Sequence, residues 1–187
     1  SSSGAPSGAP LLPWHTMKKK ILFIMHLPPP VHGQSMVCNQ IRHSEAINAE
    51  FECRYVNLSA SRNAQEVSQY GLGQIIRKLW RFGGALLATL WHLLTFRPET
   101  CYLTITCHGI PFLKDAPFVL LCKLFGRKIV LHQHNKGMKS CSSRPIYRQL
   151  MPLVYRNTTV VLLSWQLYED VADIVKREQI RICPNGI

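Results

Sequence analysis

The chain has 187 residues, which is enough for one domain whose core needs no disulfide bonds for stability. Its seven cysteines are scattered, and no two have the C-x-x-C spacing, which argues against a zinc ribbon or a redox motif. We expect them to be reduced, as in a cytoplasmic protein. The 22 Lys and Arg outnumber the 10 Asp and Glu, which favours an anionic partner: phospholipid headgroups, phosphorylated substrates or nucleic acid.

The first sixteen residues, SSSGAPSGAPLLPWHT, are small, rich in Ser, Gly and Pro, and uncharged. Met17 follows, and the apolar run Ile21–Met25 after it is too short for the core of a secretory signal. We therefore interpret residues 1–16 as a disordered remnant of an expression vector, and residues 17–187 as one domain.

Short apolar runs alternate with helical patterns along the rest of the chain. The first half is predicted to contain a strand at 20–25, a helix at 34–47, a strand at 51–58, a polar loop at 59–70, a long helix at 75–96 and a strand at 100–106. The second half is predicted to contain a helix at 111–125, a strand at 128–131, a polar loop at 132–143, a helix at 144–156, a strand at 158–163, a helix at 165–176 and a strand at 179–183.

This alternation is typical of a doubly wound α/β domain with a mainly parallel, Rossmann-like sheet flanked by helices. Ligands of such sheets bind beyond the carboxyl ends of the strands. The loops 26–35, 104–112, 132–143 and 163–165 are therefore the candidate sites.

The loop after the first predicted strand, HLPPPVHGQS, contains three prolines and one glycine. Gly33 at the start of a helix would let backbone N–H groups approach a phosphate. A single glycine forms neither the G-x-G-x-x-G fingerprint of dinucleotide-binding proteins nor a Walker A loop. From the residues alone, a ligand-binding loop and a rigid proline connector both remain open.

A second polar segment, LHQHNKG, begins at the end of the predicted strand 128–131. In an extended backbone His132 and His134 point to the same side. No acidic residue or third histidine lies near them in sequence, so we expect no metal site; a solvated polar loop is the alternative. Ser164 follows the fifth predicted strand as a natural helix N-cap, and no G-x-S-x-G motif surrounds it.

The predicted helix 75–96 is amphipathic. Its apolar face holds Ile75, Ile76, Leu79, Phe82, Leu86, Leu87, Leu90, Leu93 and Leu94, and the opposite face holds Arg77, Lys78, Arg81, Ala85, Ala88, Thr89 and His92. Three charges disfavour a membrane-spanning position. We expect the helix to lie on an anionic membrane surface, with its basic side on the headgroups and Trp80 and Trp91 near the boundary. Alternatively, the helix simply covers the sheet.

Four segments together resemble the N-terminal domain of glycosyltransferase family 4, which contains retaining enzymes of the GT-B fold that build bacterial surface polysaccharides and glycolipids. These segments are KILFIM with PPPVHGQS, then KIVLHQH, VVLLSWQLYEDV and RICPNGI. The resemblance covers residues 18–187, and RICPNGI, similar to the linker between the family's two domains, is its most specific part. The chain departs from the family in one respect, because His32-Gly33 replaces the usual paired glycines of the first loop.

The resemblance implies roles for individual residues. Gly33 would offer its N–H to the donor phosphate, and His134 would contact the transferred sugar and stabilise the transition state. Ser164 would line the cleft, and Asn185 and Gly186 would mark the interdomain hinge. The remaining expected donor- or acceptor-binding residues are Gln34, His132, Asn135 and Lys136. The two histidines leave the functional one open, although the match to the strand end favours His134.

The family's second domain, which holds the nucleotide, is absent from this chain. The nucleotide-sugar donor would therefore bind mainly elsewhere, and this chain alone would be inactive. The resemblance also implies a saccharide or lipid-linked acceptor, no metal or other cofactor, and a cytoplasmic location, peripheral to the inner membrane. Nucleic acid is not expected, because no recognition motif is present. A function of another class stays open: a non-catalytic module that docks on a membrane and presents an acceptor to a separate catalytic chain.

Overall fold

The computed structural model describes residues 18–29, 31, 33–59 and 71–184. The predicted leader 1–16, most of the predicted loop 59–70, and the predicted hinge residues Asn185 and Gly186 lie outside the described residues. Within the described part, the strands are β1 (Lys20–Met25), β2 (Glu52–Asn57), β3 (Thr100–Ile105), β4 (Lys128–Gln133), β5 (Thr159–Leu162) and β6 (Ile180–Ile182). The helices are α1 (Gly33–His43), α2 (Glu45–Glu50), α4 (Leu72–Thr95), α5 (Gly109–Leu124), α6 (Met138–Ser142), α7 (Pro145–Tyr155) and α8 (Tyr168–Val171).

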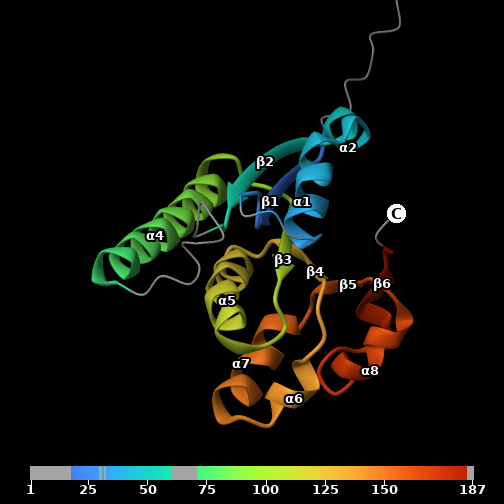
Figure 1. The fold of residues 1–187 in the computed structure, drawn as a ribbon. Helices are drawn as coiled ribbons and strands as arrows, with labels where there is room; N and C mark the ends of the chain where they lie inside the picture. The colour runs from blue at the N-terminus through green and yellow to red at the C-terminus, as the bar shows by residue number, and fades with distance from the viewer. Residues whose placement is uncertain (1–17, 30, 32, 60–70, 185–187) are drawn as a thin grey trace, which may run out of the picture.

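The six described strands form one parallel sheet in the order β2-β1-β3-β4-β5-β6 (Figure 1). The inner strands are continuous apolar runs because helices cover them on both faces. In β1, Leu22, Ile24 and Met25 are fully buried, and in β3 Leu103 is 1% exposed. The predicted fold class, a doubly wound parallel sheet flanked by helices, is therefore confirmed.

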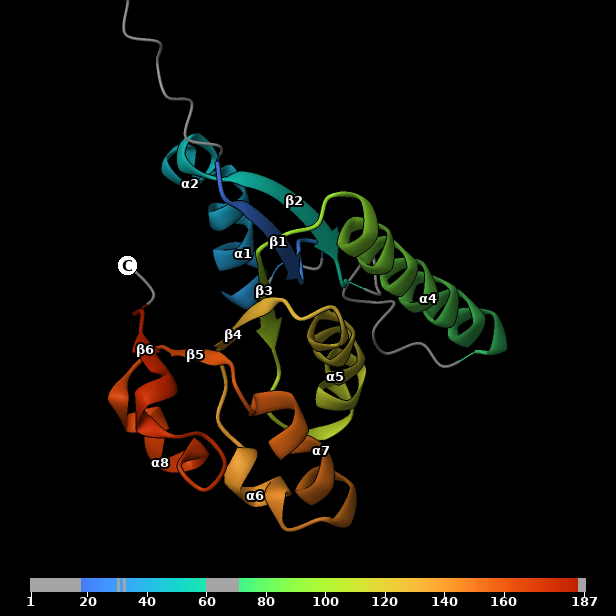
Figure 2. The same cartoon turned by 180° about the vertical axis from the view of Figure 1, so that it is seen from behind.

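The chain changes direction across the sheet at β1. It first moves from β1 outward to β2, then crosses back to β3 and continues to β6. Helices α1 and α2 lie on one face, whereas α4, α5 and α7 lie on the other (Figure 2). Right-handed crossovers explain this division, because reversing the direction of travel moves the connecting helix to the opposite face. The carboxyl ends of β1 and β3 form the switch point, where ligands of such sheets bind.

Three predicted elements differ from the structure. The first predicted helix is interrupted at Ser44, whose hydroxyl accepts a hydrogen bond from the N–H of Ile47 (3.4 Å) and so begins α2. The predicted loop 132–143 in fact begins with the last two residues of β4 and contains α6. The predicted helix 165–176 is only a 3₁₀ turn, Trp165–Leu167, followed by the single turn of α8.

Helix α4 is rotated relative to the prediction. Thr89 is fully buried, its hydroxyl donates to the carbonyl of Ala85 (2.8 Å), and Ala85 and Ala88 pack against the core. The expectation that these three residues face away from the sheet was wrong. Their small volume lets the helix approach the sheet closely, and several larger apolar residues are exposed instead. We call this exposed set the α4 stripe: Leu72, Ile76, Leu79, Trp80, Leu87, Trp91 and Leu94.

The α4 stripe does not make a membrane span. Among the described helices, none is both long enough and apolar enough to cross a bilayer. All seven cysteines lie in the described part of the chain and are free thiols, as predicted, and five of them are buried.

Candidate functional site

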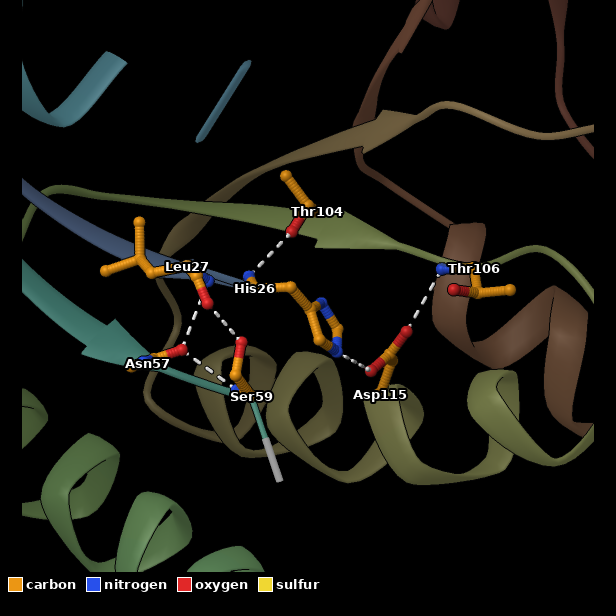
Figure 3. Close-up of polar contacts among 7 residues, drawn as sticks. All are labelled: His26, Leu27, Asn57, Ser59, Thr104, Thr106 and Asp115. Carbon is orange, nitrogen blue, oxygen red and sulfur yellow. Dashed lines mark hydrogen bonds and ion pairs between the residues drawn. The ribbon is translucent and has the colours of Figure 1, made fainter. Parts of the chain in front are cut away.

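Polar side chains gather at the carboxyl edge of the sheet, on both of its faces. His26 follows β1 directly, and its backbone N–H donates to the hydroxyl of Thr104 in β3 (3.4 Å) (Figure 3). The side chain extends over α5, where its Nε2 lies 3.8 Å from Oδ1 of Asp115. The second carboxylate oxygen of Asp115 accepts the backbone N–H of Thr106 (3.0 Å). Residues from β1, β3 and α5 therefore meet at the switch point.

The carboxyl group of Asp115 is buried, and its polar contacts among the described residues are those with His26 and the N–H of Thr106. Its exposure is 4%, and burial is the main cause that raises the pKa of its carboxyl from 3.8 to about 7. The N–H of Thr106 and the charge of Lys114 partly oppose this shift. The contact between His26 and Asp115 becomes an ion pair only when the imidazole is protonated and the carboxyl is ionised.

A cavity of about 680 Å³ adjoins this pair, between α4, α5 and the ends of β1 and β2. Lys78 and Arg81 of α4 line it together with Lys114 of α5. Two of the three cations on the basic side of α4 therefore line this cavity, and both are half-buried. Arg77 is exposed and donates to the side-chain oxygen of Gln74.

Hydrogen bonds between side chains and backbone join the ends of β1 and β2 beside the cavity. Asn57 Oδ1 accepts the N–H groups of Leu27 (3.1 Å) and Ser59 (2.9 Å), and the hydroxyl of Ser59 donates to the carbonyl of Leu27 (Figure 3). These bonds fix the backbone that carries His26.

The two predicted histidines lie on the opposite side of the sheet. Tyr102 and His132 are joined by a hydrogen bond between the phenol oxygen and Nδ1, and the rings of His132 and His134 are 4.0 Å apart at 33°. The prediction that both histidines point to the same side is confirmed. The Nε2 atoms of both rings are buried and have no hydrogen-bond partner among the described residues.

Both imidazoles are kept neutral by their surroundings. Burial lowers the pKa of His132 from 6.5 to about 4, and the neighbouring His134 adds to this effect. Burial also lowers the pKa of His134. At neutral pH this pair therefore offers uncharged hydrogen-bonding groups in a partly dehydrated place.

Asn135 has a structural contact that the sequence did not reveal. Its Oδ1 accepts the N–H of Cys107 (3.2 Å), and its carbonyl accepts from the thiol of Cys107 (3.3 Å) and from Nε2 of Gln133 (3.1 Å). These bonds join the loops that follow β3 and β4. Lys136, next along the chain, is exposed.

Asp170 fixes the same loop from α8. Its carboxylate accepts the backbone N–H groups of Gly137 (2.8 Å), Met138 (2.9 Å) and Lys139 (3.3 Å), which are the first N–H groups of α6. Gly137 itself has φ of +136°, which L side chains rarely adopt, and packs against the ring of His108.

The other predicted residues lie along the same edge of the sheet. Gly33 begins α1, is exposed, and has open space where a side chain would be. Beside it, Nε2 of Gln34 is buried without a partner among the described residues. Ser164 is half-buried after β5 and occupies the predicted N-cap position, at the start of the 3₁₀ turn, but its side chain makes no capping bond. Asn185 and Gly186 lie outside the described residues.

His26 and Asp115 were not identified as site residues from the sequence. Two signals were available: His26 opens a loop already marked as a candidate, and Asp115 is a lone acid in the apolar segment FLKDAPFVLL. Within the described part of the chain, no three His, Cys, Asp or Glu residues form a group that could bind a metal ion.

Comparison with known proteins gives no family: no protein-family model matches this chain, and no curated protein matches it significantly. Function is therefore inferred from the fold and from the geometry of the carboxyl edge.

We predict that Asp115 makes stability depend on pH. A carboxyl with a raised folded-state pKa holds its proton more tightly when folded, so stability is lost as pH rises from about 4 to about 7. Asp115→Asn should remove this loss, which is at most about 4 kcal/mol for a pKa raised from 3.8 to about 7. Urea unfolding at several pH values measures it. The exposed Asp173→Asn is the control, and equal pH profiles for Asp115→Asn and wild type would contradict the prediction.

We also predict that Gly137→Ala destabilises the protein by about 1–3 kcal/mol or more. A Cβ at this position would lie 2.5 Å from Cδ2 of His108, on a backbone at φ +136°. Gly84→Ala in α4 is the matched control, because no heavy atom lies within 4 Å of its Cβ position, and it should stabilise by about 0.5–1 kcal/mol. Chemical denaturation compares the two variants, and equal effects would show that Gly137 is not conformationally required.

Proposed function

We propose that the chain is the N-terminal, acceptor-side domain of a retaining GT-B glycosyltransferase. The full-length enzyme would transfer a sugar from a nucleotide-sugar donor to a polysaccharide or glycolipid acceptor. The observation that carries the proposal is the pair of neutral imidazoles at the carboxyl end of β4, whose buried Nε2 atoms lack partners among the described residues. Buried polar groups are normally hydrogen-bonded, so such atoms favour a ligand at this edge.

His134 is the better candidate for direct contact with the sugar. It is half-buried at the end of the strand, whereas His132 is 3% exposed within β4. A neutral imidazole held in a partly dehydrated place can hydrogen-bond a sugar hydroxyl more strongly than it could in water. His132 would then act as a positioning residue, since Tyr102 holds its Nδ1 and its ring packs against His134.

The start of α1 suits the phosphates of the donor. Gly33 leaves the first backbone N–H groups of this helix accessible, and a helix N-terminus favours an anion. Gln34, with an unpaired Nε2 in the same turn, offers a further donor. The nucleotide itself would be held by a second domain, so we expect the present chain alone to be inactive. The proposed reaction uses no metal or other cofactor.

A mutational test separates the two histidines. In the full-length protein, His134→Ala should lower kcat about 10²-fold or more, the loss typical of one positioned polar group, while changing the unfolding free energy little. His132→Ala should reduce kcat less and lower stability, because it removes a buried ring. Turnover of a radiolabelled nucleotide sugar measures the effect. Full activity in His134→Ala together with loss in His132→Ala would assign the sugar contact to His132 instead.

The α4 stripe supports a second candidate function, a non-catalytic module that docks on a membrane and presents an acceptor to a separate catalytic chain. The seven exposed apolar side chains of this stripe are unusual for a surface in contact with water alone. Transfer by a single longer chain would favour the enzyme. Transfer that requires a separate partner protein would favour the module.

Either function is compatible with contact at an anionic membrane surface, which we propose occurs through the α4 stripe. Trp80 and Trp91, 79% and 64% exposed, would lie at the interface, and Arg77 would meet the headgroups. Trp80→Ser with Trp91→Ser should abolish sedimentation with anionic vesicles, whereas Leu124→Ser, an exposed apolar residue on α5, should not. Wild-type binding that is equal for neutral and anionic vesicles, or unchanged in the tryptophan variant, would rule out this surface.

A further inference from the structure

The cavity between α4 and α5 has the size and the walls of a ligand site. Its volume, about 680 Å³, lies within the range of roughly 300–1,000 Å³ that is typical of small-molecule sites. The walls are mainly apolar: Phe82 and Ala85 come from α4, and Pro111, Leu113 and Phe118 come from α5. Such walls suit a hydrocarbon chain, because they offer it apolar contact and few hydrogen bonds.

Most of the charged groups around the cavity are positive. Lys78 and Arg81 approach from α4, and Lys114 approaches from α5. Asp115 is the only acid among the described residues that line the cavity, and its carboxylate is buried against the N–H of Thr106. Three cations near a mostly apolar volume create a positive potential at its edge, which favours an anionic headgroup. A phosphate matches several cations better than a single carboxylate does, since it carries more charge and more acceptor oxygens.

The cavity is continuous with the exposed apolar surface of α4. Ile75 and Leu79 line the cavity, yet they are 50% and 63% exposed. Leu79 also belongs to the α4 stripe. The stripe and the cavity therefore share an apolar side chain, that of Leu79, which a hydrocarbon chain could contact at both places.

We propose that this cavity binds a single-chain lipid phosphate, with its hydrocarbon chain between α4 and α5 and its phosphate at Lys78, Arg81 and Lys114. The site lies on the face of the sheet that carries α4 and α5, whereas His132 and His134 lie with Tyr102 on the other face. The cavity and its charges provide this site whether or not the chain takes part in glycosyl transfer.

Isothermal titration calorimetry with n-dodecyl phosphate, kept below its critical micelle concentration, tests the site directly. We expect saturable binding of one molecule per chain. Lys78→Glu with Arg81→Glu should weaken this binding at least tenfold, and Arg144→Glu with Arg148→Glu on exposed positions of the α7 region is the matched charge control. Ala85→Phe, which fills the cavity, should weaken binding to a similar extent; circular dichroism verifies that each variant is folded.

Further ligands and one further variant separate the possible sources of binding. Dodecyltrimethylammonium should bind at least tenfold more weakly than dodecyl phosphate, and inorganic phosphate should not bind measurably at the same concentration. Trp80→Ser with Trp91→Ser should retain dodecyl phosphate binding, since these side chains do not line the cavity. Equal binding of the cationic amphiphile would indicate adsorption on the α4 stripe, and equal binding of inorganic phosphate would indicate a site for free phosphate. Either result, or wild-type affinity in both the charge-reversal and the Ala85→Phe variants, would overturn the proposal. No sugar donor is present in these titrations, so failure of the proposed transfer reaction would leave their outcome unaffected.

Discussion

The register between β3 and β4 determines on which face of the sheet the histidines of the candidate site lie. Thr104 is opposite His132 and Ile105 is opposite Gln133. This pairing places Tyr102 and His132 on one face, where they meet His134, and directs Gln133 to the other face, where its Oε1 accepts the hydroxyl of the buried Tyr155 (3.1 Å). A slip of one residue would exchange the two faces, so that the imidazole entered the apolar core and the amide left it. Burial of both faces therefore fixes the site together with the fold.

A second set of polar contacts holds the loops beyond these strands, and its polar groups are hydrogen-bonded to one another. Asn135 joins Cys107 to Gln133, and Asp170 satisfies the first N–H groups of α6. Against this background, the Nε2 atoms of His132 and His134 differ, because the described residues offer them no partner. Buried polar groups are normally paired, so two buried imidazole atoms without a partner among the described residues support, in our interpretation, the proposal of a ligand at the strand ends.

Much of the fold could be predicted from the sequence because each buried parallel strand is a short apolar run that can be recognised locally. The segment KILFIM was placed as a strand with both boundaries correct, and the other strands differed by at most two residues at either end. The break at Ser44 was missed because a polar residue in an amphipathic pattern can be either an exposed helical position or a cap. The rotation of α4 was missed because the small residues Ala85, Ala88 and Thr89 are less apolar than leucine, yet they allow the closer packing.

The site was only partly predictable, because local patterns in the sequence do not show which distant residues meet. Periodicity placed His132 and His134 on one side of a strand, which the structure confirms. His26 and Asp115, however, are far apart in sequence and meet only because β3, which precedes α5, pairs with β1, and no local pattern shows this pairing. The direction of Lys78 and Arg81 depended on the rotation of α4, so their place in the cavity could not be known from the helix alone.

The central claim is that the carboxyl edge of β4 holds two neutral, dehydrated imidazoles whose buried Nε2 atoms have no hydrogen-bond partner among the described residues. Long-range ¹H–¹⁵N NMR of the histidine rings, recorded as a function of pH, tests it most directly. We predict that His132 titrates with a pKa of about 4 and His134 with a pKa below its ordinary value of 6.5, so that each ring is more than half neutral at pH 6.5. We also predict that the bond from Tyr102 to Nδ1 holds His132 in the tautomer protonated at Nε2. If both histidines titrated with a pKa near 6.5 and their tautomers exchanged rapidly, the rings would be solvated. That result would contradict this account of the site.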